Sequence, residues 1–343
     1  MQTLPTMNAV ILAGGFGNRL KPLTDEKPKP MLAVANKPML DYTISHLASF
    51  GIKDYVFTLA YKPEQIVDWA TGYIGATCRF SVEEIPLGTL GGVKAVEDYL
   101  DDTFFVVSGD AIENIDFAAL LDAHQNSGAL VTMAATEVSD PSQFGVVKTN
   151  EWGIVTGFIE KPPRGTVENA LVNCGVYCID KRALELVPKD TKYDFSLDLF
   201  PQLVENGKLA AYIHEGYWRD TGTLESLFVT NFELAQGSFF PPAPHQERAS
   251  TSSEYSYRSG NLIGSGVSID GFATNSILSE GCIVEHGAQI DSCIVLDGAV
   301  VTGNHKNTII HKDGTIELDK LNLLQHIEDV AASDLWSDSR GGH

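Results

Sequence analysis

Short apolar runs alternate with helix-like segments from residue 8 to about residue 236, and this order constrains the fold most strongly. The apolar runs at residues 8–12, 55–60, 104–108 and 130–135 have the length of buried strands. Between two of them, Leu40, Ile44 and Leu47 share one face of a helix. Repeated strand–helix–strand order predicts an α/β fold, with a mostly parallel sheet and helices on both faces.

A second pattern begins after residue 260, where apolar residues recur at six-residue intervals: Phe272, Leu278, Val284, Ile290 and Leu296. This hexapeptide period predicts a left-handed parallel β-helix that stacks these residues inside its coils, and a simple alternating strand pair is the alternative. The segment before it is rich in Pro, Ser and Gly, which is typical of a linker. We therefore expect an α/β domain at 1–236, a linker at 237–260, a β-helix at 261–318, and a short helix with a disordered tail at 319–343.

Composition excludes several classes of function. A chain of 343 residues is too long for one compact core. Its formal net charge of −21 argues against binding to nucleic acid or to an anionic membrane. The five cysteines are scattered, which favours buried thiols in a reducing cytosol over a zinc site. No apolar run reaches membrane-spanning length, so we expect a soluble, cytoplasmic protein.

The segment after the first apolar run carries the strongest functional signal. Gly14, Gly15 and Gly17 permit a tight loop whose backbone N–H groups can approach an anion closely. Basic residues follow at once in a chain that is otherwise acidic: Arg19, Lys21, Lys27 and Lys29. We interpret this segment as a cradle for a polyphosphate.

Two common phosphate loops do not fit this segment. The P-loop requires a Lys-Ser or Lys-Thr pair, which does not follow these glycines. The dinucleotide fingerprint requires a third glycine where Leu20 stands, and Pro22 follows. The segment instead resembles the signature of the sugar-1-phosphate nucleotidyltransferases, LAGGxGTRLxPLT followed by PKPM and KPM, at residues 12–24, 28–31 and 37–39. Asn18 stands where that family usually has Thr.

Further motifs of the same family follow along the first domain. They are PLGTAG-like at 86–92, GD at 109–110, FGVV at 144–147, FxEKP at 158–162, NTG-like at 173–175 and WxDxGT at 218–223. The resemblance implies a Rossmann-like nucleotidyltransferase sheet. It also implies the reaction: a sugar 1-phosphate attacks the α-phosphorus of a nucleoside triphosphate, which releases pyrophosphate and gives an NDP-sugar.

The resemblance also implies roles for individual residues. Asp110 and Asp220 would bind Mg²⁺, and the catalytic set would be Arg19, Lys29, Asp110, Lys161 and Asp220. The sugar phosphate would be bound by Gly145, Glu160, Lys161, Asn173 and Gly175. The nucleotide would be bound by Leu12, Ala13, Gly14, Gly15, Gly17, Asn18, Arg19, Lys29, Glu83, Glu84, Pro86, Gly88, Thr89, Gly109 and Asp110.

Within the family, the PKPM, PLGTLGG and DTGT forms resemble mannose-1-phosphate guanylyltransferases, which make GDP-mannose from GTP and mannose 1-phosphate. Glu83 or Glu84 could accept both donors of a guanine edge, although backbone groups of the same loop could read the base instead. The alternatives are a glucose-1-phosphate uridylyl-, thymidylyl- or adenylyltransferase and a non-catalytic regulatory homologue, which would be expected to lose the charged residues present here. We expect no nucleic-acid or membrane partner, and we expect a homo-oligomer assembled through the β-helix.

Overall fold

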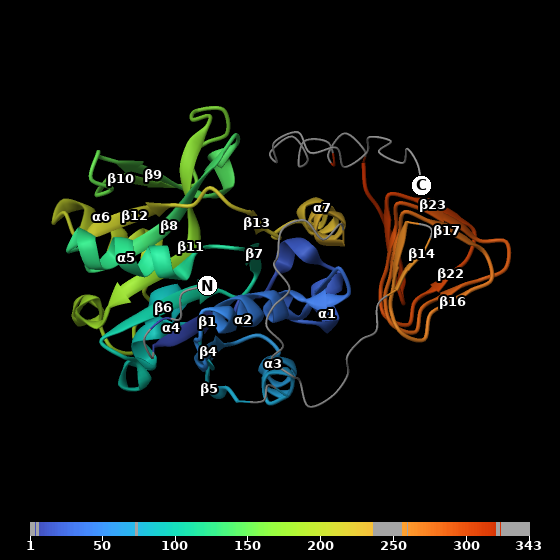
Figure 1. Cartoon of the computed structure of the whole chain (residues 1–343), viewed down its shortest axis with the longest axis horizontal. Helices are drawn as coiled ribbons and strands as arrows, with labels where there is room; N and C mark the ends of the chain where they lie inside the picture. The colour runs from blue at the N-terminus through green and yellow to red at the C-terminus, as the bar shows by residue number, and fades with distance from the viewer. Residues whose placement is uncertain are drawn as a thin grey trace. The chain divides into compact units, whose positions relative to one another are not determined.

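The computed structural model describes residues 4, 7–72, 75–235, 256–258, 260–319 and 323 (Figure 1). They form two units: one with residues up to 32 and Pro38–Asp220, and one with Ala33–Lys37, residues 221–235 and residues from 256 onward. The expected C-terminal helix and tail lie outside the described residues, Asp319 and Leu323 apart, as does most of the expected linker. The four domain limits therefore stay predictions.

The first unit is built on a nine-stranded sheet with the path β10-β9-β11-β6-β1-β4-β5, beside which β8 pairs with β11 and β12. β6, β1, β4 and β5 are parallel neighbours, and β12 is parallel to β8. β11 is antiparallel to β6, β8 and β9, so the sheet is mixed beyond β6. The α/β fold class is confirmed. The strands are β1 (Asn8–Leu12), β4 (Asp54–Leu59), β5 (Thr77–Val82), β6 (Thr103–Ser108), β8 (Val131–Val138), β9 (Gly145–Thr149), β10 (Val155–Glu160), β11 (Ala170–Asp180) and β12 (Leu209–Ile213).

Strand residues point alternately into two apolar cores, one on each face of the sheet. Ile11 and Phe105 pack into the core that includes residues of α2, α3 and α5. Val10 and Val106 pack into the core that includes residues of α4 and α6. Both faces are covered, which explains the continuous apolar runs. The helices are α1 (Leu23–Glu26), α2 (Met39–Ser49), α3 (Pro63–Ala70), α4 (Gly88–Ala95), α5 (Phe117–Ser127) and α6 (Phe200–Glu205), with short turns η1 (Asn18–Leu20), η2 (Lys29–Met31), η3 (Glu97–Tyr99), η4 (Pro141–Gln143), η5 (Lys181–Leu186) and η6 (Phe195–Leu199).

The central parallel strands end at the same edge of the sheet. Leu12 at the end of β1 is in register with Thr58 and with Ser108. Beyond it, the Ala13 N–H donates to the Thr58 carbonyl at 3.0 Å, and the Gly109 N–H donates to the Leu12 carbonyl at 2.9 Å. The glycine loop and the GD motif therefore begin side by side, where open α/β sheets bind their ligands.

The second unit contains α7 (Leu224–Ala235) and a parallel β-helix with three faces. The faces are β15-β18-β21-β24, flanked by antiparallel β14 and β25, then β16-β19-β22, and β17-β20-β23. The predicted left-handed sense of the coil stays a prediction. The strands are β14 (Ser256–Arg258), β15 (Asn261–Ile263), β16 (Ser268–Ile269), β17 (Phe272–Thr274), β18 (Ile277–Leu278), β19 (Ile283–Val284), β20 (Gln289–Asp291), β21 (Ile294–Val295), β22 (Val300–Val301), β23 (Asn304–Lys306), β24 (Thr308–His311) and β25 (Gly314–Glu317).

The six-residue register holds only in the middle of the β-helix. Leu278, Val284 and Ile290 are buried inside the coils, as predicted. The prediction is wrong for Phe272, which points outward and is 71% exposed, while Ala273 packs against the core. Val295 takes the inward place expected for Leu296. The coils are not all multiples of six residues, so a fixed period loses the register at its ends.

A short turn, residues 33–37, joins α7 to the β-helix within the second unit. The Ala35 N–H donates to Asn231 Oδ1 on α7 at 2.8 Å. The Asn36 amide donates to the Leu278 carbonyl at 3.1 Å and accepts from the Ser279 hydroxyl at 2.8 Å. Among the described residues, no helix is both long and apolar enough to cross a membrane.

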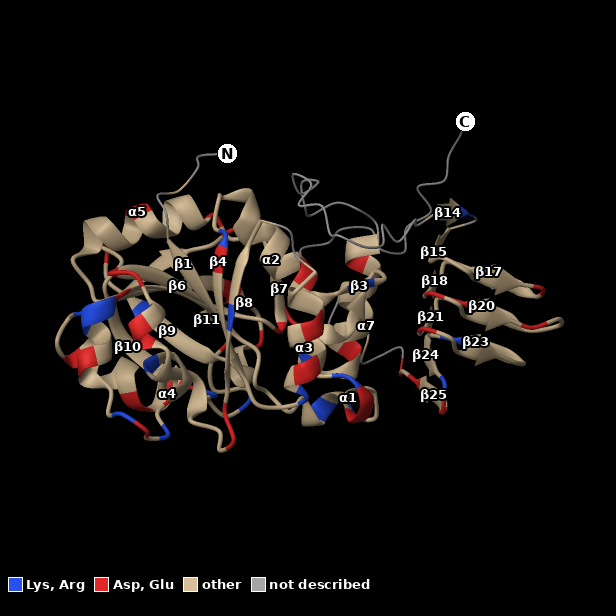
Figure 2. Cartoon of the chain, turned by 90° about the horizontal axis from the view of Figure 1, so that it is seen from below, with Lys and Arg blue, Asp and Glu red and all other residues tan. Residues whose placement is uncertain are grey.

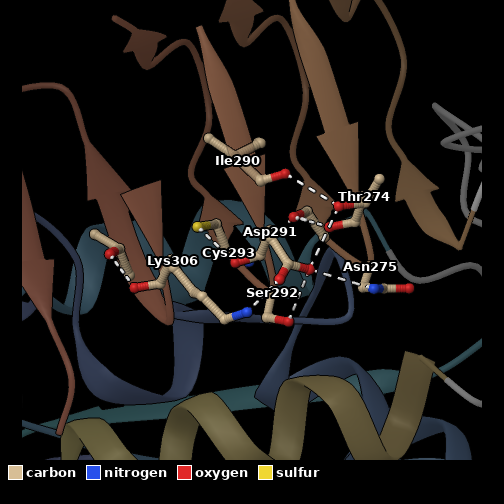
Figure 3. Close-up of polar contacts among 9 residues, drawn as sticks. Thr274, Asn275, Ile290, Asp291, Ser292, Cys293 and Lys306 are labelled. Atoms are coloured by element: carbon tan, nitrogen blue, oxygen red, sulfur yellow. Dashed lines mark hydrogen bonds and ion pairs between the residues drawn. The ribbon is translucent and has the colours of Figure 1, made fainter. Parts of the chain in front are cut away.

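Asp291 connects neighbouring coils on the β17-β20-β23 face (Figure 3). Its Oδ2 accepts from Lys306 Nζ at 2.7 Å, and its Oδ1 accepts from Thr274 Oγ1 and Asn275 Nδ2 at 3.3 Å each. Burial raises the pKa of Asp291, but Lys306 and these hydrogen bonds outweigh it and lower that pKa. The carboxylate is thus saturated by the fold's own donors, which indicates a structural role.

We expect Asp291→Ala to lower the free energy of unfolding of the β-helix by about 1 kcal/mol at neutral pH, because these donors lose their acceptor. The loss should fade in acid: a lowered carboxyl pKa gives stability above the unfolded-state value of about 3.9, and that stability disappears as pH falls through the folded-state pKa. Thermal unfolding at pH 7 and pH 3 measures both effects. Asp313→Ala, at an exposed turn, is the control, and equal unfolding temperatures for the two variants would show that Asp291 adds nothing.

Candidate active site

Two acidic residues that are far apart in the sequence meet beside a two-stranded ribbon, β7 (Ala111–Glu113) and β13 (Trp218–Asp220). Asp110 directly precedes β7, and Asp220 ends β13 paired with Ala111. The antiparallel register thus brings both carboxylates to one end of the ribbon. Lys29 Nζ contacts both of them, at 2.9 Å from Asp110 Oδ2 and 3.1 Å from Asp220 Oδ1.

The charges at this point are well defined. Lys29 is 6% exposed, and burial alone would lower its pKa, but the two carboxylates outweigh burial and raise it. Burial raises the pKa of Asp110, but Lys29 and the Ser108 hydroxyl, which donates to Asp110 Oδ1 at 2.7 Å, hold it below its usual value. Lys29 thus lies between two carboxylates, and the Arg19 guanidinium is 3.9 Å from one of them, at Asp220 Oδ2. With Arg19 included, the group has two acidic and two basic side chains.

No group of three or more His, Cys, Asp or Glu side chains in the described part of the chain is arranged to bind a metal ion. A metal here would therefore have two protein carboxylates and take its other ligands from phosphate and water. Mg²⁺ is often bound in this way, through one or two carboxylates and the substrate's phosphates.

The three glycines of the loop differ in what the fold requires of them. A Cβ on Gly14 would lie 3.3 Å from the Ala60 backbone nitrogen, at the end of β4. Gly17 has a φ of +62°, and its Cβ would lie 2.8 Å from Thr24 Cγ2. A Cβ on Gly15 would meet no other heavy atom of the described residues within 4 Å. The fold therefore favours glycine at 17, through its positive φ and the close contact with Thr24, and leaves little room for a side chain at 14, whereas the space at Gly15 is open to a ligand.

Arg19 and Lys21 follow the loop in different environments. Arg19 Nη2 is 3.9 Å from Asp220 Oδ2, and its Nη1 donates to Gln143 Oε1 at 3.4 Å. Lys21 is paired with Asp25 at 2.9 Å near α1, where basic and acidic segments alternate (Figure 2). The structure thus brings together Arg19, Lys29, Asp110 and Asp220. Sequence reasoning missed Ser108 and Gln143, although each directly precedes a motif: Ser108 the GD motif and Gln143 the FGVV motif.

The residues predicted to bind the sugar phosphate come from the antiparallel part of the sheet. Gly145 on β9 pairs with Glu160 on β10. A Cβ on Gly145 would lie 2.4 Å from Phe158 Cζ and 2.9 Å from Glu160 Oε2, so a larger residue there would displace the Phe158 ring and the Glu160 carboxylate. Lys161 has a φ of +45° and its Nζ is 3.6 Å from Glu160 Oε1.

Residues 173–175, which we call the NCG turn, lie within β11 where its register with β8 shifts, and they connect this group of residues to the acidic pair. Asn173 donates to the Tyr177 hydroxyl at 2.8 Å and accepts from the Gly175 N–H at 3.0 Å. A Cβ on Gly175 would lie 3.2 Å from Ser108 Cβ, so this turn packs against the strand end that leads to Asp110. Trp218 Nε1 donates to the Cys174 carbonyl at 2.9 Å, which joins the turn to β13.

The PLGTLGG segment, which leads into α4, is held by the acidic residue Glu83 before it and by a distant segment. Glu83 Oε2 accepts from the Leu87 N–H at 2.8 Å, and burial raises the pKa of Glu83 more than this bond lowers it. The Tyr193 carbonyl accepts from the N–H groups of Leu90 and Gly91 at 3.0 Å each. Thr89 donates to Asp194 Oδ2 at 2.7 Å. Glu83 thus faces its own loop, whereas Glu84 and Pro86 are exposed.

A buried carboxyl next to the ribbon was also missed. Glu113, the last residue of β7, is 4% exposed. Its Oε2 accepts from the Ile115 N–H at 2.5 Å and lies 3.7 Å from His46 Nε2, whereas its Oε1 has no hydrogen-bond partner among the described residues. Burial raises the pKa of Glu113 despite the opposing effects of His46 and Ile115.

The chain is similar in sequence to a known protein family and to several of its members. Residues 8–237 match the family model described as "Nucleotidyl transferase". The chain is 33% identical over 300 residues to the mannose-1-phosphate guanylyltransferase of Mycobacterium tuberculosis, covering 86% of this chain and 79% of the relative. It is 40% identical over 225 residues to the mannose-1-phosphate guanyltransferase of Debaryomyces hansenii, covering 63% and 61%.

Among solved structures, HddC from Yersinia pseudotuberculosis is similar, with 27% identity and a TM-score of 0.59. The match covers 67% of this chain and 100% of HddC. HddC has also been crystallised in complex with GMP-PN, and that structure matches equally well.

The glycines provide a matched pair of substitutions. We expect Gly15→Ala to fold normally but to weaken nucleoside triphosphate binding by about tenfold, because the new methyl group occupies the open space at the loop. We expect Gly17→Ala to lower the free energy of unfolding by about 1–3 kcal/mol, because of its positive φ and the contact with Thr24. Thermal unfolding and calorimetric titration separate the two effects. Normal binding by Gly15→Ala would show that the open space is not a ligand site.

We expect the buried Glu113 carboxyl to make the stability of the wild-type protein depend on pH. A carboxyl whose pKa is raised by folding stabilises the protein at low pH, and this contribution is lost as pH rises above the unfolded-state value of about 4.3. Glu113→Gln removes the ionisation, so the unfolding temperature of the variant should rise relative to wild type between pH 5 and pH 8. Glu205→Gln, on the exposed end of α6, is the control. A pH-independent difference for Glu113→Gln would contradict the assignment.

Proposed function

The chain belongs to the nucleotidyl transferase family, and from this premise we propose that it transfers a nucleoside monophosphate from a nucleoside triphosphate to a sugar 1-phosphate, releasing pyrophosphate. The observation that carries the proposal is the contact of Lys29 with both Asp110 and Asp220 at the strand ends beside the glycine loop. A site with cationic groups and a pair of carboxylates suits the binding of a triphosphate with its metal ion.

The family generally uses a divalent metal ion. We assign Mg²⁺ to Asp110 and Asp220, because both carboxylates already lie within 3.1 Å of a single cationic atom, Lys29 Nζ. Carboxylate oxygens are the hard ligands that Mg²⁺ prefers. When bound, the ion would neutralise charge on the phosphate oxygens.

The chain's own residues then position the two anionic reactants. The attacking sugar phosphate is already an anion, so no general base and no covalent enzyme intermediate are needed. The glycine loop and Arg19 hold the triphosphate, Lys161 holds the sugar phosphate, and Glu160 accepts from sugar hydroxyls. Lys29 offsets the repulsion between the reactants. Catalysis then depends on positioning and on fixed charge.

We propose GTP and mannose 1-phosphate as the substrates. The support is the mannose-1-phosphate guanylyltransferase name of the relatives and the GMP-PN complex of HddC. The Glu83 carboxylate adds little support, because one of its oxygens is bonded to the Leu87 N–H. Glucose-1-phosphate uridylyl-, thymidylyl- or adenylyltransfer remains the alternative within the family. A non-catalytic homologue is disfavoured because the charged set is complete and Arg19, Lys29, Asp110 and Asp220 lie together.

We also propose a cytoplasmic enzyme that assembles as a homo-oligomer through its β-helix. The five cysteines are free thiols, which is typical of a reducing compartment. The β-helix carries no part of the proposed site, which leaves its faces available for assembly.

Pyrophosphate release from a grid of GTP, UTP, dTTP and ATP with mannose 1-phosphate and glucose 1-phosphate tests the reaction and its substrates. We expect the highest kcat/KM for GTP with mannose 1-phosphate. A tenfold preference for another base, about 1.4 kcal/mol, would overturn the guanylyl assignment and leave the reaction class intact. No release with any pair would contradict the reaction itself.

Substitution of either member of the acidic pair, Asp110 and Asp220, should lower turnover. We expect Asp110→Asn and Asp220→Asn each to lower kcat at least about 100-fold at saturating Mg²⁺, because the metal ion supplies several kcal/mol of charge stabilisation. Asp122→Asn, exposed on α5, is the control and should keep wild-type turnover. Near-normal kcat for Asp110→Asn would refute its role as a metal ligand.

A further inference from the structure

Tyr61 belongs to none of the motifs above, yet it contacts the glycine loop and the chain that follows it. It lies just beyond the end of β4 and precedes α3. Its ring packs on that of Phe16 with the centroids 5.4 Å apart. Its hydroxyl donates to the Thr24 carbonyl at 2.9 Å. Thr24 in turn donates from Oγ1 to the Gly17 carbonyl at 3.0 Å.

These contacts hold the loop at two places. Phe16, in the middle of the loop, is held by the aromatic ring, although it remains 49% exposed. Gly17, where the loop enters η1, is held through Thr24, whose methyl group lies where a Cβ would otherwise project. Gly15, between Gly14 and Phe16, faces open space. The clamp, which we define as Tyr61, Thr24 and Phe16, thus fixes the two residues that directly follow Gly15, the part of the loop that is open to a ligand.

The backbone next to Tyr61 has an unusual conformation. Lys62 has a φ of +46°, in the left-handed region that lysine rarely adopts. Its Nζ lies 5.5 Å from the centroid of the Tyr61 ring. Strained residues of this kind persist where the surrounding structure holds them and are frequent at ligand-binding sites. Tyr61 itself is only half-buried and belongs to neither apolar core of the first unit, so core packing does not account for its position.

We propose that Tyr61 is a positioning residue for the nucleoside triphosphate, because it fixes the glycine loop in the conformation that presents its N–H groups to the phosphates. The inference rests on the proposed function. A loop that is ordered before binding loses less conformational entropy when the phosphates bind, so its rigidity contributes directly to affinity. Tyr61 touches no substrate and acts through Phe16 and Thr24.

Four variants test the clamp: Tyr61→Phe, Tyr61→Leu, Thr24→Val and the double variant Tyr61→Phe/Thr24→Val. The measurements are the Kd of GTP by calorimetry, the KM of each substrate, and the unfolding temperature. We expect Tyr61→Phe to raise the Kd of GTP about fivefold, as the loss of one hydrogen bond would. Tyr61→Leu also loses the ring contact and should raise it about fiftyfold. The KM of mannose 1-phosphate should stay within about twofold, since that subsite lies on β9, β10 and β11.

The double variant tests whether the clamp acts as a unit. The Tyr61 hydroxyl and the Thr24 hydroxyl act in series on Gly17. The Kd of GTP for the double variant should therefore be little higher than that of the single variant with the higher Kd. If the fold-changes in the Kd of GTP for the two single variants multiply in the double variant, the two hydroxyls act independently and the clamp is overturned. Tyr99→Phe, an exposed tyrosine of η3, is the control and should bind GTP as wild type does.

The remaining outcomes separate the clamp from the proposed function. If wild-type protein binds none of the four nucleoside triphosphates, the proposed function is wrong and the inference fails with it. If wild type binds GTP and Tyr61→Phe binds it equally well at an unchanged unfolding temperature, only the inference is wrong. An equal rise in the KM of both substrates would show general damage to the site and would also overturn the clamp.

Discussion

The contact of the Lys29 ammonium with two carboxylates is the interaction on which the site depends. Asp110 and Asp220 would repel each other if they were brought together alone. Lys29 bridges them and is itself almost fully buried, so its ammonium depends on the two carboxylates, whereas Asp110 and Asp220 keep 34% and 27% of their side-chain surface exposed. Loss of one member of a buried charged group leaves the others without compensation, which is costly in a protein interior. The β7–β13 ribbon provides the backbone frame that keeps the two carboxylates at one end.

The end of β6 connects the acidic pair, Asp110 and Asp220, to the residues proposed to bind the sugar phosphate. Ser108 donates to Asp110, and Gly175 of the NCG turn packs directly against Ser108. Trp218 joins the same turn to β13, two residues before Asp220. A displacement of β11, which carries part of the proposed sugar-phosphate site, would therefore reach the acidic pair through a few direct contacts. This arrangement suits a reaction in which two anions must be aligned before transfer.

Local sequence patterns predicted the parts of the structure that depend on neighbouring residues. The bounds of β1 and the buried face of α2 follow from short-range periodicity, and the strand ends place the glycine loop beside the GD motif. The pairing of β7 with β13 joins segments more than a hundred residues apart, and no local pattern encodes it. The direction of Glu83 depends on a hydrogen bond to Leu87, and the outward direction of Phe272 depends on coil lengths that a fixed period does not capture. Glu113 escaped notice because a single acidic residue gives no sign of burial.

The overall charge of the chain opposes the ligands that the site is built to bind. A formal net charge of −21 repels a triphosphate and a sugar phosphate at long range. At physiological ionic strength, however, screening limits interactions between exposed charges to about 8 Å, so the fixed groups nearest the ligand decide its affinity. In the proposed function, those groups are Arg19, Lys29, Lys161 and the backbone N–H groups of the glycine loop. Under the proposed function, affinity for two anionic substrates in so acidic a chain must come from short-range, pre-positioned contacts, and the proposed role of Tyr61 in ordering the glycine loop would meet this requirement.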